Sequence, residues 1–308
     1  MDELAEAAKF ADDNKLAVFV LGGGSNVLIS EDGFEGLVIK IDICGLWIND
    51  LRSRLSTGFI LTVGAGEMWD DVVAKAAELN VSGIENLSLI PGTVGGAVYQ
   101  NIGAYGAELK DVLASVKVYD IKTGNIIELS NGECDFKYRS SIFKHNKNLI
   151  ILEAELLLSK DNKPNLSYPD LKKRFHGAKP TITEVRQAII EIRRNKMPYP
   201  EEVGNAGSFF KNPIIPIADY RLLMIKFPNL KGHDLGDDSI KLSAAQLIEK
   251  TGFKGKKVGN VGVSEKHALV LVNYGGSTAR ELTDLAEIIK VAVETKFGVN
   301  LETEVEMI

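Results

Sequence analysis

Positions 89–106 carry the segment Leu-Ile-Pro-Gly-Thr-Val-Gly-Gly-Ala-Val-Tyr-Gln-Asn-Ile-Gly-Ala-Tyr-Gly, in which five of eighteen residues are glycine and one is proline. Most of the side chains between the glycines are small. Such a segment either bends repeatedly or lets a ligand approach its backbone closely. The segments around it decide between these two interpretations.

A second glycine cluster, Gly22-Gly-Gly-Ser-Asn26, follows a valine-rich apolar run that predicts a strand over 15–21. Successive backbone N–H groups in such a turn converge on an anion without competing side chains, which suits a phosphate or pyrophosphate. A predicted strand follows the cluster where a dinucleotide fingerprint would have a helix. Taken alone, an ordinary tight turn explains the cluster equally well.

A second glycine-rich loop favours the interpretation that these loops bind a ligand. Residues Ile90-Pro-Gly-Thr-Val-Gly-Gly96 offer further amides, and Thr93 adds a hydroxyl. Gln100 and Asn101 add carboxamides, which can bond to ring carbonyls and ring nitrogens. Two such loops in one domain suit a long ligand that has both a pyrophosphate and a heteroaromatic ring. Flavin adenine dinucleotide (FAD) is such a ligand.

The hydropathy pattern predicts an α+β protein, in which helices alternate with strands early, followed by hairpins and a helix-rich C-terminal third. Helices are predicted over 3–14, 68–80, 183–195 with Thr183 as N-cap, 243–251 and 278–297. Strands are predicted over 15–21, 27–30, 37–41, 59–63, 112–120, 125–129, 149–158, 269–272 and 301–307. Polar loops are predicted over 160–180 and 204–213.

Composition argues against several classes of protein. The net charge of −6 disfavours nucleic acid as a partner. Two distant cysteines and four scattered histidines predict neither a disulfide framework nor a metal site. No apolar run is long enough to span a membrane, and the N-terminus has no signal pattern, so the cytoplasm is the expected location. We expect a monomer.

The two glycine loops resemble the flavin-binding loops of the UDP-N-acetylenolpyruvoylglucosamine reductase family, as does Gln100-Asn-Ile-Gly-Ala-Tyr-Gly106. Three further motifs match that family in order: Tyr138-Arg-x-Ser-x-Phe-Lys144, Gly204-Asn-Ala-Gly-Ser-Phe-Phe-Lys-Asn-Pro213 and Leu301-Glu-x-Glu-Val305. The resemblance runs from about residue 3 to the C-terminus.

The resemblance implies a domain organisation. It implies a bilobal FAD-binding domain of the vanillyl-alcohol-oxidase (PCMH) type over 1–160. A tyrosine loop and a connecting helix would follow over 161–195. An α+β substrate-binding domain over 196–308 would end in a strand that returns to the active site. The family has a further strand before the first predicted helix, and without it a neighbouring strand would lack a partner.

The resemblance also implies an activity. NADPH would reduce FAD, which would pass a hydride to the enolpyruvyl group of UDP-N-acetylglucosamine enolpyruvate, giving UDP-N-acetylmuramate for the bacterial cell wall. Arg139, a bidentate donor, would stabilise negative charge at the carboxylate end. Ser208 resembles the family's proton donor, and Glu304 resembles the glutamate beside the developing charge. The plainer interpretations are an ion pair for Arg139, a loop hydroxyl for Ser208 and a solvated strand face for Glu304.

The resemblance assigns the remaining site residues. The cofactor-binding residues would be Gly22, Gly23, Gly24, Ser25, Asn26, Ile90, Pro91, Gly92, Thr93, Gly95, Gly96, Gln100, Asn101, Gly103, Ala104, Tyr105 and Arg193. The substrate-binding residues would be Tyr138, Tyr168, Lys196, Asn212 and His267. Two positions depart from the family's pattern. His267 replaces a glutamine, so its charge would follow pH, and Val98-Tyr99 replaces a proline–aliphatic pair.

Two other functions remain open at this point. One is a flavin oxidase of the same fold that uses oxygen. The other is a nucleotide-sugar-binding module that has lost its flavin. The colour of the protein, and its response to NADPH, distinguish the three.

Overall fold

The computed structural model describes residues 2–50, 58–161 and 163–308. The chain divides into two compact units. Unit 1 combines the described parts of 1–24 and 35–193, and unit 2 combines 25–34 with 194–308. Almost all of the predicted middle segment, 161–195, therefore belongs to unit 1. Residues 25–34, which fall within the predicted FAD-binding domain, belong to unit 2.

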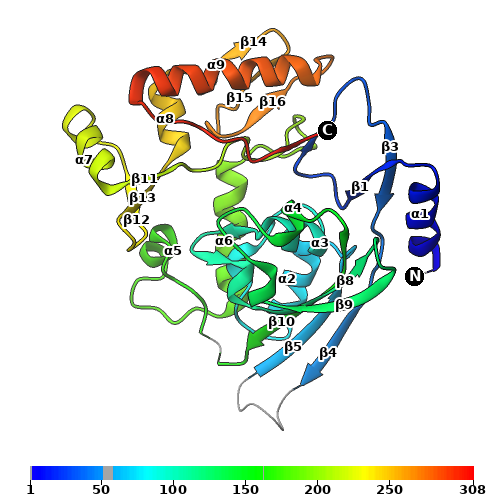
Figure 1. Cartoon of the computed structure of the whole chain (residues 1–308). Coiled ribbons are helices and arrows are strands. Elements are labelled where there is room, and N and C mark those ends of the chain that lie inside the picture. The colour runs from blue at the N-terminus through cyan, green and yellow to red at the C-terminus, as the bar shows by residue number, and fades with distance from the viewer. Residues whose placement is uncertain (1, 51–57, 162) are drawn as a thin grey trace. The chain divides into compact units, whose positions relative to one another are not determined.

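Unit 1 holds most of the strands in the N-terminal half of the chain (Figure 1). Its helices are α1 (Asp2–Asp13), α2 (Trp69–Glu78), α3 (Val94–Gln100), α4 (Ile142–His145), α5 (Pro169–Arg174) and α6 (Ile182–Lys196), the end of which is counted with unit 2. Its strands are β1 (Ala17–Leu21), β3 (Gly36–Lys40), β4 (Leu46–Asp50), β5 (Gly58–Gly64), β6 (Gly103–Ala104), β7 (Ala107–Glu108), β8 (Leu113–Asp120), β9 (Asn125–Ser130) and β10 (Leu149–Ser159).

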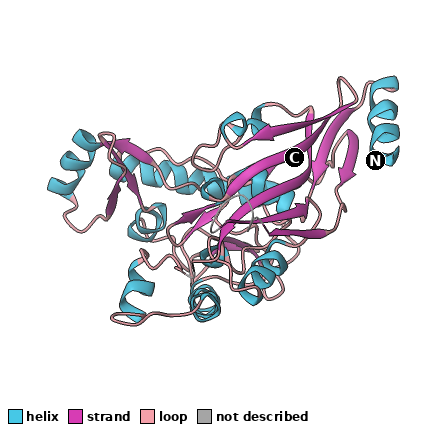
Figure 2. Ribbon diagram, turned by 90° about the horizontal axis from the view of Figure 1, so that it is seen from below, coloured by secondary structure: helices cyan, strands magenta, loops and turns pink. Residues whose placement is uncertain are grey.

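The main sheet of unit 1 is antiparallel and has the strand order β4-β5-β10-β8-β9. Alternate residues of β5 are buried, with Phe59, Leu61 and Val63 all at most 4% exposed. Helix α3 packs against β10 and β5, and the main core of the unit forms there. Figure 2 shows the long strands of this sheet lying side by side.

A parallel pair, β1 and β3, forms a separate small sheet in unit 1, with Ala17 opposite Gly36 and Leu21 opposite Lys40. Both strands run the same way, so their carboxyl ends meet at one edge. The chain leaves β1 there as Gly22–Gly24 and leaves β3 there toward Asp42. Ligands in open α/β sheets commonly bind beyond such an edge.

Unit 2 contains helices α7 (Ile217–Lys226), α8 (Ala244–Lys250) and α9 (Ala279–Phe297). Its strands are β2 (Val27–Leu28), β11 (Ile214–Pro216), β12 (Gly232–Asp234), β13 (Ser239–Leu242), β14 (Lys257–Val258), β15 (Val261–Val263), β16 (Leu271–Asn273) and β17 (Glu306–Met307). They form the sheets β11-β13-β12 and β14-β15-β16 and the parallel pair β17-β2. Residues of α8, α9 and β15 share its core. The β17-β2 pair explains why 25–34 is counted with this unit.

Most predicted elements are present, but several segments differ from the prediction. Residues 94–100 form α3 where a loop was predicted, and 169–174 form α5 within the predicted linker. Only Glu306–Met307 of the predicted terminal strand, 301–307, is a strand. Strand β4 was not predicted.

The cap of α6 also differs from the prediction. Thr183 lies inside the helix, and Thr181 accepts a hydrogen bond from the backbone N–H of Glu184. The Glu184 carboxylate accepts in return from the backbone N–H of Thr181, which makes a reciprocal capping box.

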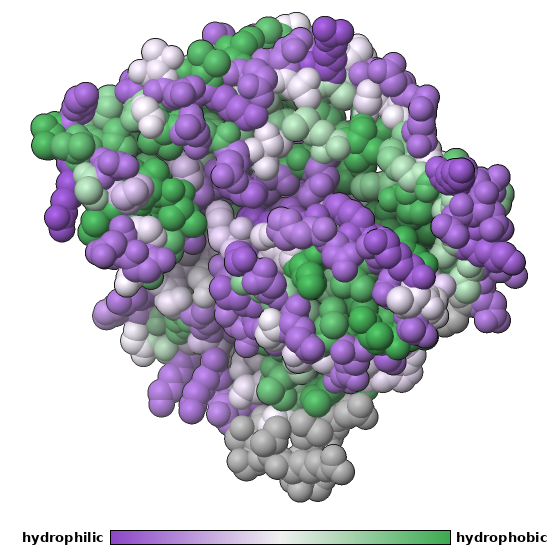
Figure 3. Space-filling view, in the orientation of Figure 1, coloured by the Kyte–Doolittle hydropathy of each residue, from purple (hydrophilic) through white to green (hydrophobic). Residues whose placement is uncertain are grey.

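Polar side chains are spread among smaller apolar areas on the face drawn in Figure 3. None of the helices in the described residues has the length and apolar character needed to cross a membrane. The described residues also contain no group of three or more histidine, cysteine, aspartate or glutamate side chains that could hold a metal ion.

Candidate active site

A cavity of about 320 Å³ opens in unit 1 beyond the carboxyl ends of β1 and β3. This volume lies at the lower end of the range for pockets that bind cofactors and small molecules. Its lining consists of Leu21, Gly22, Gly23, Gly24, Lys40, Asp42, Gly66, Met68 and Thr93.

The two glycine loops meet at this cavity. A Cβ atom added to Gly22 would lie 2.7 Å from Thr93 Oγ1, and one added to Gly23 would lie 2.9 Å from Gly92 Cα. Real Cβ atoms essentially never come so close to another heavy atom. Glycine is therefore required at Gly23, where the obstacle is backbone. The loops that the sequence assigned to one ligand thus lie against each other.

Two amides of the second loop are occupied within the protein. Val94 N–H donates to Glu67 O at 2.9 Å, and Gly95 N–H donates to Ala65 O at 2.8 Å. The prediction that the loop presents these amides to an anion is therefore wrong for Val94 and Gly95. Gly95 instead allows a close approach, since a Cβ there would lie 3.1 Å from Ala65 Cβ. Gly96 N–H points at Thr93 Oγ1, 3.5 Å away, as in an N-cap.

The Asn101 side chain is also hydrogen-bonded within the protein. It is fully buried and ends α3 with a φ of +44°. Its carboxamide nitrogen donates to Glu108 Oε2 and Lys137 O, both at 3.1 Å, and its oxygen accepts from Lys110 N–H. Because both donors are used, the side chain ties three segments together and has no N–H left for a flavin ring. Gln100 is 8% exposed.

Arg139 lies in a tight turn of unit 1, where Lys137 and Ser140 pair as an isolated bridge. Its φ of +55° is unusual for a non-glycine residue, and such strained positions cluster at functional sites. Its guanidinium donates to Gly103 O at 2.6 Å and lies 5.2 Å from the centre of the Tyr138 ring. The structure thus joins the Tyr138–Arg139 motif to Gly103-Ala104, which is β6.

Tyr168 lies at the start of α5, and its ring meets the Tyr105 ring edge-on at 4.9 Å. Asn165, three residues earlier, receives a hydrogen bond from Asn86 and donates to Glu85 and to the Gly106 carbonyl. These contacts hold the base of the tyrosine loop against the flavin loop within unit 1.

Ser208 and Glu304 lie on adjacent extended segments of unit 2. Glu304 N–H donates to Phe209 O, and Phe209 N–H donates to Leu269 O, each at 2.8 Å. Ser208 pairs with Val270 as an isolated bridge. The Asn26 carboxamide donates to Glu304 O at 3.2 Å, so Asn26 helps to hold this segment. Ser25 is counted with the same unit.

The other predicted substrate residues occupy separate places in unit 2. His267 Nδ1 accepts from Leu269 N–H at 3.2 Å, so the neutral ring carries its proton on Nε2. Asn212 Oδ1 accepts from Ala244 N–H at 2.9 Å, at the start of α8. Lys196 is exposed at the end of α6. Their contacts with a substrate remain predictions.

Five residues of the cavity were missed by sequence reasoning: Leu21, Lys40, Asp42, Gly66 and Met68. Lys40 and Asp42 form an ion pair at 3.0 Å beyond the end of β3. Met68 is 49% exposed, whereas the adjacent Trp69 is fully buried. The parallel pairing of β1 with β3 would have pointed to Lys40 and Asp42, but it is not visible in the sequence.

Comparison with known proteins decides the family. Residues 1–130 match the model of an FAD binding domain, and residues 198–308 match that of "UDP-N-acetylenolpyruvoylglucosamine reductase, C-terminal domain". The UDP-N-acetylenolpyruvoylglucosamine reductase of Ralstonia nicotianae is 42% identical over 307 residues, which is 98% of this chain and 90% of that protein. This chain belongs to the UDP-N-acetylenolpyruvoylglucosamine reductase family.

Solved structures agree with membership of this reductase family. The UDP-N-acetylenolpyruvylglucosamine reductase of Thermus caldophilus has a TM-score of 0.67 at 25% identity, covering 99% of this chain and 88% of that one. The 6-hydroxy-D-nicotine oxidase of Arthrobacter nicotinovorans has a TM-score of 0.52 at 15% identity, covering 96% and 78%, and so shares the fold. The predicted α+β fold with a flavin domain of the vanillyl-alcohol-oxidase type is confirmed.

Proposed function

We propose that this chain reduces UDP-N-acetylglucosamine enolpyruvate to UDP-N-acetylmuramate with NADPH, through bound FAD, in peptidoglycan precursor synthesis. The observation that carries the proposal is the contact of Gly22 and Gly23 with Gly92 and Thr93 beside one cavity. In a chain of this family, glycines at this wall leave the backbone open to close approach by a dinucleotide.

The residues present fit FAD. Gly22 and Gly23 carry no side chain, so a ligand in the cavity that they line can approach their backbone directly. Gly22–Gly24 and Thr93 would hold the cofactor, with Lys40 adding a cation at the wall. When bound, FAD supplies the hydride that NADPH delivers to it and that the substrate receives. We further propose that the protein acts as a monomer in the cytoplasm.

Arg139 is proposed to bind the carboxylate of the enolpyruvyl group. The alkene accepts a hydride only when its carboxylate end can hold the resulting negative charge. A guanidinium presents donors in a fixed fork, and the hydrogen bond to Gly103 O restrains its orientation. Tyr138, beneath the guanidinium, would support the same group.

Ser208 is proposed to supply the proton that completes the reduction. Its hydroxyl is a weak acid, but an enolate carbon is basic enough to accept from it once the two are aligned. The bridge to Val270 fixes the Ser208 backbone. Glu304 follows on the adjacent segment, where it would stand beside the developing charge.

An anaerobic titration of the purified protein tests the function. We expect a yellow protein whose flavin bands bleach with NADPH and return when UDP-N-acetylglucosamine enolpyruvate is added. Return of colour with oxygen but not with the enolpyruvyl sugar would indicate a flavin oxidase. A colourless protein that binds no added FAD would indicate a nucleotide-sugar-binding module.

A further inference from the structure

The backbone just before the second glycine loop has an unfavourable conformation. Leu89 has a φ of +59°, in the left-handed region that disfavours residues with a Cβ atom. Ile90, Pro91, Gly92 and Thr93 follow it directly, and the last two meet Gly22 and Gly23. The direction of the chain at Leu89 therefore determines how this loop approaches the cavity.

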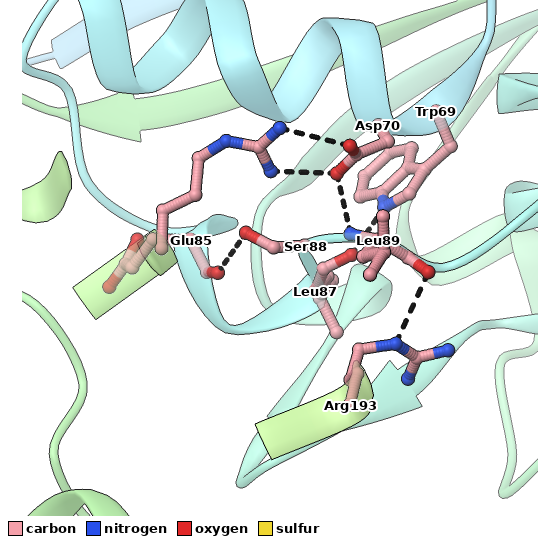
Figure 4. A network of polar contacts seen from close by, with 8 residues as sticks. Trp69, Asp70, Glu85, Leu87, Ser88, Leu89 and Arg193 are labelled. Carbon is pink, nitrogen blue, oxygen red and sulfur yellow. Dashed lines mark hydrogen bonds and ion pairs between the residues drawn. The ribbon is translucent and has the colours of Figure 1, made fainter. Parts of the chain in front are cut away.

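Leu89 is held from both sides (Figure 4). Its N–H donates to Asp70 Oδ1, and its carbonyl accepts from Arg193 Nε at 3.2 Å. The residues before it are also held, since Leu87 O accepts from Trp69 Nε1 at 2.9 Å and Ser88 Oγ donates to Glu85 O at 2.6 Å. These hydrogen bonds hold Leu89 in its left-handed backbone conformation, although that conformation is unfavourable for a residue with a Cβ atom.

Asp70 is itself fixed in place. Its two carboxylate oxygens receive both terminal nitrogens of Arg186, at 2.7 and 2.9 Å, in a bidentate pair. Asp70 lies in the first turn of α2, where the helix dipole favours negative charge. Helix α2 and the Arg186 guanidinium therefore fix the position of the Asp70 carboxylate, which accepts the hydrogen bond from Leu89 N–H.

We propose that Asp70 is a positioning residue for the flavin: its carboxylate, held by Arg186, keeps Leu89 left-handed and so directs Gly92 and Thr93 against Gly22 and Gly23. The proposal rests on the proposed function, because it assumes that these loops hold FAD. Asp70 does not line the cavity and acts through Leu89.

The test measures FAD binding by three variants. Asp70→Ala removes the acceptor, Asp70→Asn keeps an oxygen for Leu89 N–H but loses the charge, and Asp71→Asn is the matched control. Asp71 lies in the same helical turn and is exposed. Each apoprotein is titrated with FAD, and the dissociation constant, the binding stoichiometry and the flavin absorption spectrum are recorded.

We expect Asp70→Ala to raise the dissociation constant for FAD roughly tenfold or more, with a shifted spectrum and a stoichiometry still near one. Asp70→Asn should recover part of the affinity, and Asp71→Asn should bind like the wild type. A purely structural role would instead lower the stoichiometry and leave the affinity and spectrum of the folded fraction unchanged, which would overturn the proposal.

Two outcomes separate this proposal from the function on which it rests. If the wild type binds FAD and Asp70→Ala binds it with the same affinity and spectrum, the positioning role is wrong and the function stands. If the wild type binds no FAD, both are wrong. Should Asp70→Ala fail to fold, Asp70→Asn and Arg186→Lys decide: wild-type affinity and spectrum in both would overturn the proposal, whereas weakened affinity would support it.

Discussion

Single residues in unit 2 carry the proposed proton transfer. Ser208 occupies an extended segment next to the one that bears Glu304, so two side chains with different chemistry are held one strand apart. Sequence reasoning found both residues only through a resemblance. Alternating glutamates and a loop serine are otherwise common on solvated surfaces.

Replacing Ser208 with alanine should leave reduction of the flavin by NADPH unchanged. Reoxidation by the enolpyruvyl sugar should slow by roughly 100-fold to 10,000-fold, because the proton donor is lost. Stopped-flow absorbance resolves the two half-reactions. Ser239→Ala, on β13, is the control and should leave both rates unchanged. Equal reoxidation rates in Ser208→Ala and the wild type would remove Ser208 from the mechanism.

Some helices can be predicted from a local sequence pattern, whereas others depend on packing against distant parts of the chain. Helix α9 was predicted from its apolar stripe, and the structure adds a capping box at Thr278 and a left-handed Gly298 at its end, which agree with that prediction. Helix α3 was missed because Gly95 and Gly96 lower its intrinsic propensity. Its packing on β10 and β5 outweighs that preference, and packing of this kind cannot be seen in one sequence.

The close contact between the two glycine loops predicts the effect of one methyl group. Gly23→Ala should weaken FAD binding roughly tenfold or more, because its Cβ would press on the Gly92 backbone. Gly22→Ala should do less, since the obstacle there is the Thr93 hydroxyl. Gly132→Ala, whose Cβ would meet no atom within 4 Å, is the control. FAD titration measures the affinity of each variant, and circular dichroism confirms that each variant is folded. Equal affinity for FAD in all three variants would contradict the close contact between the loops.

The cap of α6 gives a prediction about stability. Thr181→Ala should lower the free energy of unfolding by about 1 kcal/mol, because it removes the oxygen that accepts from Glu184 N–H. Thr183→Ala should change it by only a few tenths of a kcal/mol, about the scale of helix propensity. Urea denaturation compares them. A larger loss for Thr183→Ala would restore the cap to the position that the sequence suggested.

At the scale of the whole molecule, the sequence predicted the fold class better than it predicted which residues belong to each compact unit. Apolar runs predicted β5, β8 and β10, and the polar segment 160–180 predicted where β10 ends. The assignment of residues 25–34 to unit 2 depends on the β2–β17 pairing, which joins residues almost 280 positions apart. Such non-local pairing leaves no periodic pattern in the sequence.

The acid stability of the molecule should depend on Asp70. Burial by itself raises the pKa of this carboxyl, but the hydrogen bonds from Arg186 and Leu89 and the charges of Arg186 and Arg193 outweigh it, so the pKa lies below its ordinary value. The stabilisation is therefore complete above the unfolded pKa of about 4 and is lost as pH falls through the folded value.

Urea unfolding of the wild type and Asp70→Asn between pH 7 and pH 3 measures this dependence. The difference in unfolding free energy between them should be largest at neutral pH and should shrink below about pH 4. Asp71→Asn removes a neighbouring carboxylate as the control. A difference that stays constant across the range would contradict the lowered pKa of Asp70.

The most direct measurement is a crystal structure of the protein soaked with FAD. We expect density for one FAD molecule against the backbone of Gly22–Gly24 and Thr93, within the cavity that these residues line. FAD bound elsewhere while this cavity stays empty would contradict the assignment of the two glycine loops to one cofactor.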